Sequence, residues 1–322
     1  MQIFSYDKIY DFSGRQKLFL GVSALFFALA VALLTGKGMN FGIDFTGGTV
    51  VQVRYAEAAP IDKMRESLVG TRFDGALIQE FGEPQEVVIK APASSSALGT
   101  DVGDEMRVLL QPTGEFEIRR VDMVGPRVGA ELREAGLMAA LVAIVGILIY
   151  ITFRFEWRFA VASVLALVHD LIIVIGFIVV FDLQVNLDIL AALLTILGYS
   201  INDTIVVFDR IRETLAKPNH ADIKSVINDA VSKTLSRTTL TSLTTFFVVA
   251  TLFFFGGELL KPLALTLMIG IIVGTYSSIF VAASLLRFLG FDVNEWKSKE
   301  ARKAQAKAEK DRMRALYEQG TV

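Results

Sequence analysis

Six long apolar runs constrain what this chain can fold into more than any other feature of its sequence. Each run is close to the ~20 residues that a helix needs to cross ~30 Å of hydrocarbon. A chain that crosses hydrocarbon must pair its backbone polar groups internally, and an α-helix does so within one segment. We therefore predict a membrane α-helical fold with six transmembrane helices, at residues 17–35, 135–153, 159–181, 187–208, 238–256 and 263–287.

The first run shares one feature with a secretory signal peptide, because Ala28-Leu29-Ala30 resembles a cleavage site. The apolar run continues through Leu34, so a cut after Ala30 would fall inside it. We therefore interpret this run as a retained membrane anchor.

Composition argues against several classes of function. The chain is 53% apolar with a mean hydropathy of +0.51, and it contains no cysteine, which excludes disulfides and thiolate metal sites. Its two histidines, His169 and His220, are too far apart for a histidine-based zinc site. No G-x-x-x-x-G-K-[ST] loop is present, which disfavours an ATPase, and no cofactor is predicted. A net charge of −2 gives no reason to expect a nucleic-acid partner.

Lysine and arginine in the short loops predict the orientation, because these residues collect on the cytoplasmic side of a membrane. They occur at Lys8, Arg15, Lys17, Arg154, Arg158, Arg210, Arg212, Lys217, Lys224, Lys233 and along the tail from Arg287 to Arg314. The short loops on the opposite side carry only Lys261. We therefore place residues 1–16 and a charged tail at 288–322 in the cytoplasm. Residues 36–134 then lie outside, and residues 135–287 hold the second to sixth helices.

Residues 36–134 have the composition of a soluble domain and a readable order of elements. Alternating apolar residues predict strands, helical spacing after a proline predicts a helix, and the Gly82–Gln85 turn predicts a hairpin. The predicted elements are a strand at 49–55, a helix at 61–68, strands at 76–81 and 86–90, a loop at 94–96, a helix at 102–110 and a strand at 115–121. This β-α-β-β-α-β order is that of a ferredoxin-like α+β domain, a fold that hosts many functions.

A glycine-rich segment, Phe41–Gly48, joins the first apolar run to this domain. A loop of this kind can hold a phosphate where its glycines open a helix. Here a strand is predicted to follow the glycines. We therefore interpret the segment as a tight backbone turn that positions the domain against the membrane.

Asp203 is a carboxylate within the fourth apolar run. Ionising a side chain inside a bilayer costs at least ~2.5–3.5 kcal/mol, so an acid at this depth is a candidate functional residue. At 100° per residue it lies at the edge of a polar face formed with Thr195, Tyr199 and Asn202. Arg237 opens the fifth run at the same predicted depth. We predict that Asp203 and Arg237 face each other in the inner half of the membrane and couple the protein to ions or protons.

Two features of the neighbouring sequence bear on this prediction. The fifth run has a hydroxyl-rich face, at Thr234, Thr238, Thr241, Thr244 and Thr245, whose alternative role is plain helix packing. Arg210 is a competing partner for Asp203, but we interpret it as an interfacial arginine that reaches water, and Asp209 as a solvated acid at the membrane edge.

His169 and Asp170 form a second polar pair, near the middle of the third run. A buried histidine beside an acid can relay protons, or the pair can hydrogen-bond internally and fix helix packing. The sequence leaves both roles open, the proton relay and the pair that fixes helix packing. In the sixth run, Gly270, Gly274 and Ser278 recur at four-residue spacing, which predicts a small-residue helix-packing face.

These motifs resemble those of the SecD/SecF family of protein-export membrane proteins, within the resistance-nodulation-division superfamily, and those of its SecF half in particular. They are Phe41–Gly48, Val124–Leu132, Phe155–Arg158, His169–Asp170, Gly198–Asp203, Asp209–Glu213 and Leu235–Thr238. The resemblance covers essentially the whole chain. The chain lacks the SecD half of the fused form, so we expect it to act with a separate partner.

The resemblance implies a role in protein export at the bacterial inner membrane. In that family the complex with SecD and the SecYEG channel uses the proton-motive force to draw preproteins outward into the periplasm. Preproteins, YajC, YidC and the lipid bilayer are further partners that the resemblance suggests. The external domain would then be periplasmic, and the energy source would be a proton gradient rather than a cofactor.

The resemblance also assigns roles to residues. Asp203 and Arg237 match the family's proton-coupling acid and arginine, and Asn202, Asp170 and His169 are further candidates for proton coupling. The hinge and motif residues would be Gly42, Asp44, Gly47, Gly48, Gly125 and Pro126.

The sequence leaves two alternative functions open. One is an exporter of small molecules or lipids from the same superfamily, for which the external domain of roughly 100 residues looks small. The other is a membrane scaffold that transports nothing. An enzyme is the least supported class, because no nucleophile–base set or metal cluster is visible in the sequence.

Overall fold

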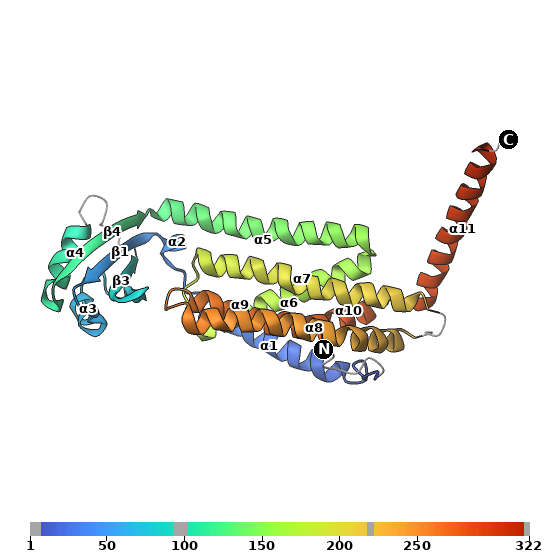
Figure 1. Ribbon diagram of the computed structural model, residues 1–322, viewed down its shortest axis with the longest axis horizontal. Helices are drawn as coiled ribbons and strands as arrows, with labels where there is room; N and C mark the ends of the chain where they lie inside the picture. The colour runs from blue at the N-terminus through green and yellow to red at the C-terminus, as the bar shows by residue number, and fades with distance from the viewer. Residues whose placement is uncertain (1–7, 93–101, 218–221, 319–322) are drawn as a thin grey trace.

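The computed structural model describes residues 8–92, 102–217 and 222–318. It shows a bundle of long helices with a small α+β unit at one end and a projecting helix at the other (Figure 1). The predicted loop at 94–96 and His220 lie outside the described residues.

Within the described residues, six helical segments are long and apolar enough to cross a membrane, which confirms the predicted number of spans. They are α1 (Gln16–Gly36), α5 (Pro126–Arg154), α6 (Trp157–Val180), α7 (Leu187–Leu215), α8 (Ile223–Phe255) and Lys261–Phe288. The last segment consists of α9 (Lys261–Ser277), a π-helical turn η2 (Ser278–Ala282) and α10 (Ala283–Phe288).

Three helices run well past the apolar runs that predicted them. Helix α5 begins at Pro126, α7 ends at Leu215 and α8 begins at Ile223. Hydropathy marks only the part of a helix that can lie in hydrocarbon, whereas the helix itself continues until a cap or a breaker ends it. As a result, Asp203 lies near the middle of α7, and Arg237 lies in the interior of α8 rather than at its start.

Helix α7 packs against α6, α8 and α9. Two glycines of α9 let it approach α7 closely, which confirms the predicted small-residue face. A Cβ atom at Gly270 would come within 2.2 Å of Ile196 Cδ1, and one at Gly274 within 3.0 Å of Ser200 Cβ. This approach brings polar side chains of α7 and α9 together.

The α+β unit is a four-stranded antiparallel sheet packed with two helices. Its elements are β1 (Gly48–Tyr55), α3 (Ile61–Leu68), β2 (Leu77–Phe81), β3 (Glu83–Pro92), α4 (Val102–Leu110), a 3-10 turn η1 (Gln111–Thr113) and β4 (Phe116–Val124). The β-α-β-β-α-β chain order is the predicted one, and the strand order β2-β3-β1-β4 places β1 and β3 in the centre. Val51, Val53 and Ile89 of these strands share one core with Met64 of α3 and Met106 of α4.

Two details of the sheet differ from the prediction. Only Gly82, with φ of +77°, separates β2 from β3, and Pro84 lies within β3 rather than in a turn. The pairing of β2 with β3 shifts between Glu80 and Phe81. An irregular place in a sheet tolerates a proline, which has no backbone N–H group to donate, and this explains why Pro84 can lie within β3. Strand β4 continues to Val124, so it runs directly into the start of α5.

The glycine-rich segment forms a short helix rather than the single tight turn predicted. Helix α2 (Ile43–Thr46) starts at Gly42, whose carbonyl accepts hydrogen bonds from the next helical turn. Gly47 follows with φ of +81°. A Cβ atom there would lie 2.8 Å from Pro126 Cα, so only glycine fits between α2 and α5.

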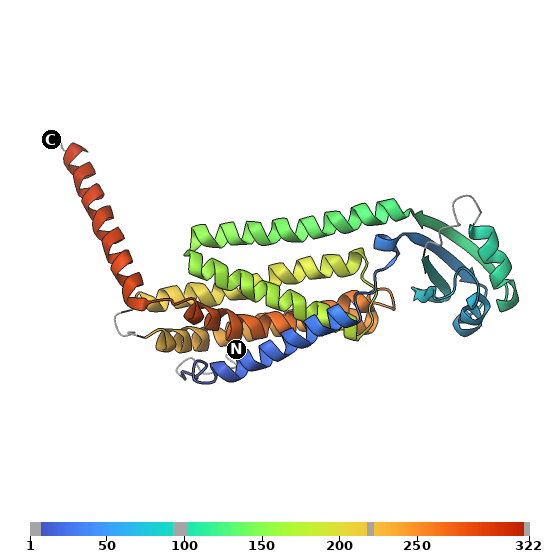
Figure 2. The same cartoon turned by 180° about the vertical axis from the view of Figure 1, so that it is seen from behind.

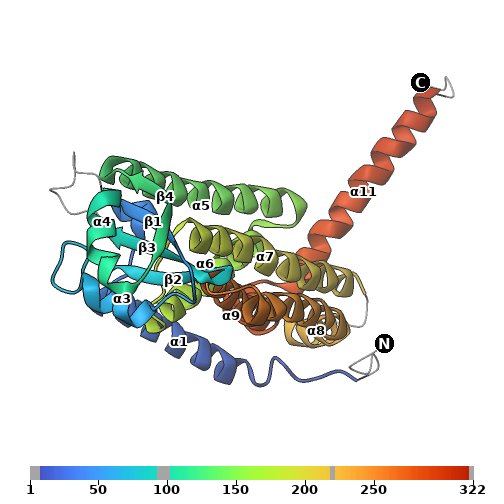
Figure 3. The same cartoon turned by 60° about the vertical axis from the view of Figure 1, so that its left-hand side comes forward.

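Both described ends of the chain lie at the end of the bundle opposite the α+β unit (Figures 1 and 2). Near the N-terminus, Ser13 N donates a 2.8 Å hydrogen bond to Asn228 Oδ1 of α8. Helix α11 (Val293–Glu318) projects away from the bundle, and its residues 301–314 are all exposed (Figure 3). The charged tail predicted at 288–322 is thus largely an exposed helix within the described residues.

Candidate functional site

Asp203 sits where three membrane helices meet. The residue is 3% exposed on α7, and Ser242 Oγ of α8 donates a 3.3 Å hydrogen bond to its Oδ2. Thr275 Oγ1 of α9 lies 2.7 Å from the same serine oxygen. A carboxylate, a serine and a threonine from three helices thus form one chain of polar contacts.

Two more hydroxyl groups lie close to this chain of contacts. Tyr199, one turn before Asp203, lies beside Ser242 and Thr275 but makes no hydrogen bond of normal geometry. Thr238 Oγ1, one turn before Ser242, is likewise buried without a hydrogen bond. A hydroxyl group can donate to an ionised carboxylate and accept from a protonated one. The cluster can therefore stabilise Asp203 in either protonation state, as a site that binds and releases a proton requires.

The structure does not join Asp203 to Arg237 directly. Their helices are neighbours, and the guanidinium is close enough to act on the carboxylate electrostatically. Arg237 is exposed, however, and these two described residues form no ion pair with each other. The prediction that Asp203 and Arg237 face each other in direct contact is wrong, because the residue of α8 that contacts the acid is Ser242 rather than Arg237.

The predicted polar faces divide between the inside and the outside of the bundle. Asn202, the neighbour of Asp203, is exposed. Of the threonines on α8, Thr238 is buried, whereas Thr241 and Thr244 are exposed. The helix rotations therefore differ from the predicted ones, and the buried side of α8 carries Ser242.

Arg210 and Asp209 take partners other than Asp203. Arg210 Nη1 lies 2.6 Å from Glu213 Oε2, and Asp209 Oδ1 lies 3.1 Å from Arg154 Nη2. Both pairs lie toward the end of α7 that is remote from the α+β unit. Arg210 therefore does not compete for Asp203.

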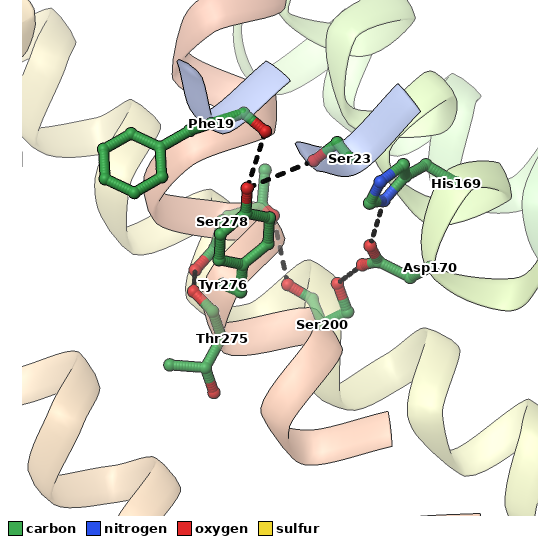
Figure 4. A network of polar contacts seen from close by, with 9 residues as sticks. Phe19, Ser23, His169, Asp170, Ser200, Thr275, Tyr276 and Ser278 are labelled. Atoms are coloured by element: carbon green, nitrogen blue, oxygen red, sulfur yellow. Dashed lines mark hydrogen bonds and ion pairs between the residues drawn. The ribbon is translucent and has the colours of Figure 1, made fainter. Parts of the chain in front are cut away.

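Asp170 forms a second buried acid site on α6 (Figure 4). Its Oδ1 lies 2.9 Å from Nδ1 of His169, and its Oδ2 accepts a 2.6 Å hydrogen bond from Ser200 Oγ of α7. The His169 ring lies parallel to Phe27 of α1, with 6.4 Å between the ring centres. This geometry is compatible with both predicted roles, a proton relay and a pair that fixes helix packing.

The two acid sites meet α7 one helical turn apart, Asp170 of α6 at Ser200 and the second site at Asp203 itself. Ser200 binds Asp170, and it also packs against Gly274 of α9. The next residue of α9, Thr275, reaches the hydroxyl cluster around Asp203. Figure 4 shows this stretch of α9 beside α1 as well, where the Tyr276 hydroxyl donates to a backbone carbonyl. A shift between α7 and α9 would therefore change the surroundings of both acids.

The predicted hinge residues gather where the α+β unit meets the bundle. Asp44 Oδ2 accepts a 3.0 Å hydrogen bond from Leu187 N, at the first residue of α7. Gly42 N donates to Val185 O at 2.7 Å, just before that helix. The other predicted positions lie between β1, β4 and the start of α5, at Gly47, Gly48, Gly125 and Pro126. These contacts fasten the glycine-rich segment to the helix that carries Asp203.

Neither acid site has the ligands of a metal centre. Asp203 is surrounded by hydroxyl groups, and Asp170 by one imidazole and the hydroxyl groups of Ser200 and Ser277. Within residues 8–92, 102–217 and 222–318, no group of three or more His, Cys, Asp or Glu side chains could hold a metal ion.

Sequence reasoning missed three residues of these sites: Ser242, Thr275 and Ser200. Ser242 had a detectable signal, because it continues the face of Thr234 and Thr238 at four-residue steps. The other two had none. Their contacts cross between helices, from Ser200 of α7 to Asp170 of α6 and from Thr275 of α9 to Ser242 of α8, and spacing along one helix does not reveal such contacts.

Two family profiles match the chain. The family described as "Protein export membrane protein SecD/SecF, C-terminal" matches residues 105–292, and the "SecD/SecF GG Motif" matches residues 32–59. The first match includes both acid sites, and the second includes the glycine-rich segment.

Full-length relatives agree with these matches. A protein named protein translocase subunit SecF from Helicobacter pylori (strain 26695) is 46% identical over the whole of both chains. A protein of the same name from Escherichia coli O157:H7 is 39% identical over 88% of each chain. The crystal structure of SecDF from Thermus thermophilus, described as a translocon-associated membrane protein, has a TM-score of 0.76 and 38% identity over 92% of this chain. This chain spans 40% of that longer protein. The chain belongs to the SecD/SecF family of protein export membrane proteins.

Proposed function

We propose that this chain is the SecF-type subunit of a SecD–SecF complex, which uses the proton-motive force to promote preprotein export through the Sec translocon. Full-length similarity to proteins named protein translocase subunit SecF supports the role in translocation. Since the chain matches 40% of the solved SecDF protein, a separate SecD chain would supply the rest of the complex.

The burial of Asp203 among hydroxyl groups of three helices is the observation that carries the proposal. An ionisable group at this depth is costly to keep, so a purely structural role would be better served by an apolar residue. The hydrogen bond from Ser242 is stronger when the carboxylate is ionised. Protonation would therefore weaken a contact between α7 and α8 and let the helices shift.

The energy needed for the conformational change sets a minimum on the driving force or on the number of protons per cycle. Moving a two-state element from 1:99 to 99:1 needs ~5.5 kcal/mol. One elementary charge that crosses 100 mV supplies ~2.3 kcal/mol. One proton at that potential is insufficient, so a larger driving force or more than one proton per cycle is required. The His169–Asp170 pair, which contacts α7 one turn away, is the second candidate for carrying a proton.

The glycine-rich segment would transmit the movement to the α+β unit. Asp44 binds the first backbone N–H group of α7, and Gly42 binds the residue two positions earlier in the chain. A shift of α7 along its axis would pull on α2 through these contacts. Strand β4 continues into α5, which gives the unit a second connection to the membrane.

We further propose that the α+β unit is a ferredoxin-like periplasmic domain and that both termini lie in the cytoplasm of a bacterial cell bounded by its inner membrane. Basic residues at the end of the bundle remote from the unit support this orientation, at Arg154, Arg158, Arg210 and Arg212. The unit would then meet preproteins as they leave the SecYEG channel. YajC and YidC are further proposed partners on the basis of family resemblance.

Replacing the buried acid tests the proposal. In inverted membrane vesicles that contain SecD, SecYEG and this chain, Asp203→Asn should insert normally and lose the stimulation of preprotein export by the proton-motive force. Arg237→Met should lose it too, because the positive charge that acts on the carboxylate is gone. Asp209→Asn is the matched control, since this carboxylate of the same helix is exposed and pairs with Arg154.

Export at the wild-type rate by both Asp203→Asn and Arg237→Met would refute proton coupling at this site. Failure of the Asp209→Asn control would instead indicate general damage to α7. Complementation of a SecF-deficient export defect would separate this proposal from a small-molecule or lipid exporter.

A further inference from the structure

A narrow apolar pocket lies between α5, α6 and α7, toward the end of the bundle that carries the α+β unit. Its volume is about 140 Å³. Its lining comes from the three helices and from the glycine-rich segment, and includes Phe41, Leu137, Ala140, Ile175, Leu190 and Leu194. Nothing in the proposed export mechanism uses this pocket.

The pocket follows two membrane helices inward from one end of the bundle. Its lining covers residues 133–140 of α5 and 190–197 of α7, or about 10 Å of each helix at 1.5 Å per residue. Leu137 is 64% exposed at its edge, so the pocket is open at the side of the bundle, where the surrounding medium is hydrocarbon. Its volume is close to the roughly 150 Å³ of an apolar cavity that accepts benzene, so part of an alkyl chain fits.

Arg133 is the charged residue in the lining. Its guanidinium lies 5.8 Å from the centre of the Phe41 ring, and among the described residues it forms no ion pair. Arg133 lies two residues before the apolar run of α5, which begins at residue 135, and this places it at the depth of lipid headgroups. An arginine at this depth favours a phosphate, which it binds with two parallel hydrogen bonds.

We propose that the pocket binds one membrane phospholipid, with an acyl chain between α5 and α7 and its phosphate on Arg133. The combination of an apolar slot with a single cation at its mouth matches an amphiphile with a phosphate head. Helix α5 contacts α6 and α2 far more than it contacts α7. The acyl chain would therefore fill the space beside α5, the helix from which the α+β unit extends.

Photocrosslinking to the full chain tests this proposal without reference to export. The protein is reconstituted in nanodiscs of phosphatidylglycerol, a fraction of which carries a diazirine on one acyl chain. Crosslinks should concentrate on residues 137–140 and 190–194. They should exceed those at Phe254, an exposed residue of α8 that reports contact with bulk lipid.

Variants should separate the phosphate contact from the acyl-chain contact. Arg133→Gln should lower the pocket crosslinks about tenfold or more, because a charged hydrogen-bond donor is lost. Arg127→Gln is the matched control, since this arginine of the same helix pairs with Glu131 and lies outside the pocket, and it should crosslink like wild type. Ala140→Phe should fill the slot and remove the pocket crosslinks while those at Phe254 persist.

Equal crosslinking of wild type and Arg133→Gln would overturn the phosphate assignment. Pocket crosslinks no stronger than those at Phe254, or crosslinks from the pocket to a second protein chain, would overturn the lipid site altogether. Since the readout is lipid contact, either outcome leaves the proposed export function untouched.

Discussion

At the scale of single residues, proton coupling depends on how hydroxyl groups hold Asp203. An acid held by an ion pair is expensive to neutralise, because removing one charge leaves the other unpaired at a cost of about 3–5 kcal/mol when both are buried. Ser242, which Thr275 contacts in turn, can instead rotate its hydroxyl hydrogen and serve either protonation state. The absence of a direct pair with Arg237, among the residues that the structure describes, therefore suits reversible protonation.

Ser242→Ala should destabilise the protein and reduce proton-dependent export. The substitution removes the donor to Asp203 Oδ2, which costs about 1–3 kcal/mol when the acceptor stays buried. Combining it with Asp203→Asn should reveal a coupling energy of about 0.5–3 kcal/mol in thermal unfolding of the purified protein. Thr241→Ala, at an exposed neighbouring position of α8, should change stability little. Equal stabilities of Ser242→Ala and Thr241→Ala would contradict the contact.

Among the helices and strands, the junction between α2, α5 and α7 is tightly constrained. Gly47→Ala should destabilise it for two reasons, the positive φ and the approach of Pro126 to 2.8 Å. Gly82→Ala separates these causes, because Gly82 has a similar φ of +77° but no atom near the position of a Cβ. We expect Gly82→Ala to lower the free energy of unfolding of the α+β unit by about 1 kcal/mol. Gly47→Ala should lower it by about 1–3 kcal/mol more than Gly82→Ala does, as measured by hydrogen exchange of the β1 amides. Similar costs for the two variants would show that α2 and α5 are not tightly packed.

The α+β unit should also show a defined sensitivity to high pH. Tyr55 lies 2.6 Å from Thr113 Oγ1, and burial raises the pKa of Tyr55 above its ordinary value of 10.0. Because the folded-state pKa is the raised one, this contribution to stability is complete below pH 10 and is lost as the pH rises above it. Amides of β1 should lose exchange protection above about pH 10 in wild type, and less steeply in Tyr55→Phe. Tyr150→Phe, at an exposed position of α5, should keep the wild-type slope.

The same elements show what could be predicted from sequence and what could not. The six spans and the β-α-β-β-α-β order were predictable, because each depends on periodicity within one segment. The helix α2 and the position of Pro84 were not, because they depend on contacts with α5 and on irregular pairing between strands. For the site, Asp203 and Asp170 were identifiable as polar residues in apolar runs, whereas Ser200 and Thr275 became identifiable only through contacts between different helices.

At the scale of the whole molecule, the arrangement connects the acid sites to the α+β unit through α7. This helix carries Asp203 near its middle, contacts Asp170 through Ser200, and is held at its first turn by Asp44. Both described chain ends lie at the opposite end of the bundle from the unit (Figure 1). A proton-driven shift of α7 would therefore act on the side of the membrane where the unit lies.

Proton flux through the reconstituted complex shows whether Asp203 carries the proton. Liposomes that contain this chain with its SecD partner and an internal pH indicator would be given an imposed pH gradient. We expect proton entry in the wild-type and Asp209→Asn complexes, and entry at the level of empty liposomes with Asp203→Asn. Wild-type flux through a correctly assembled Asp203→Asn complex would rule out Asp203 as the proton-coupling group.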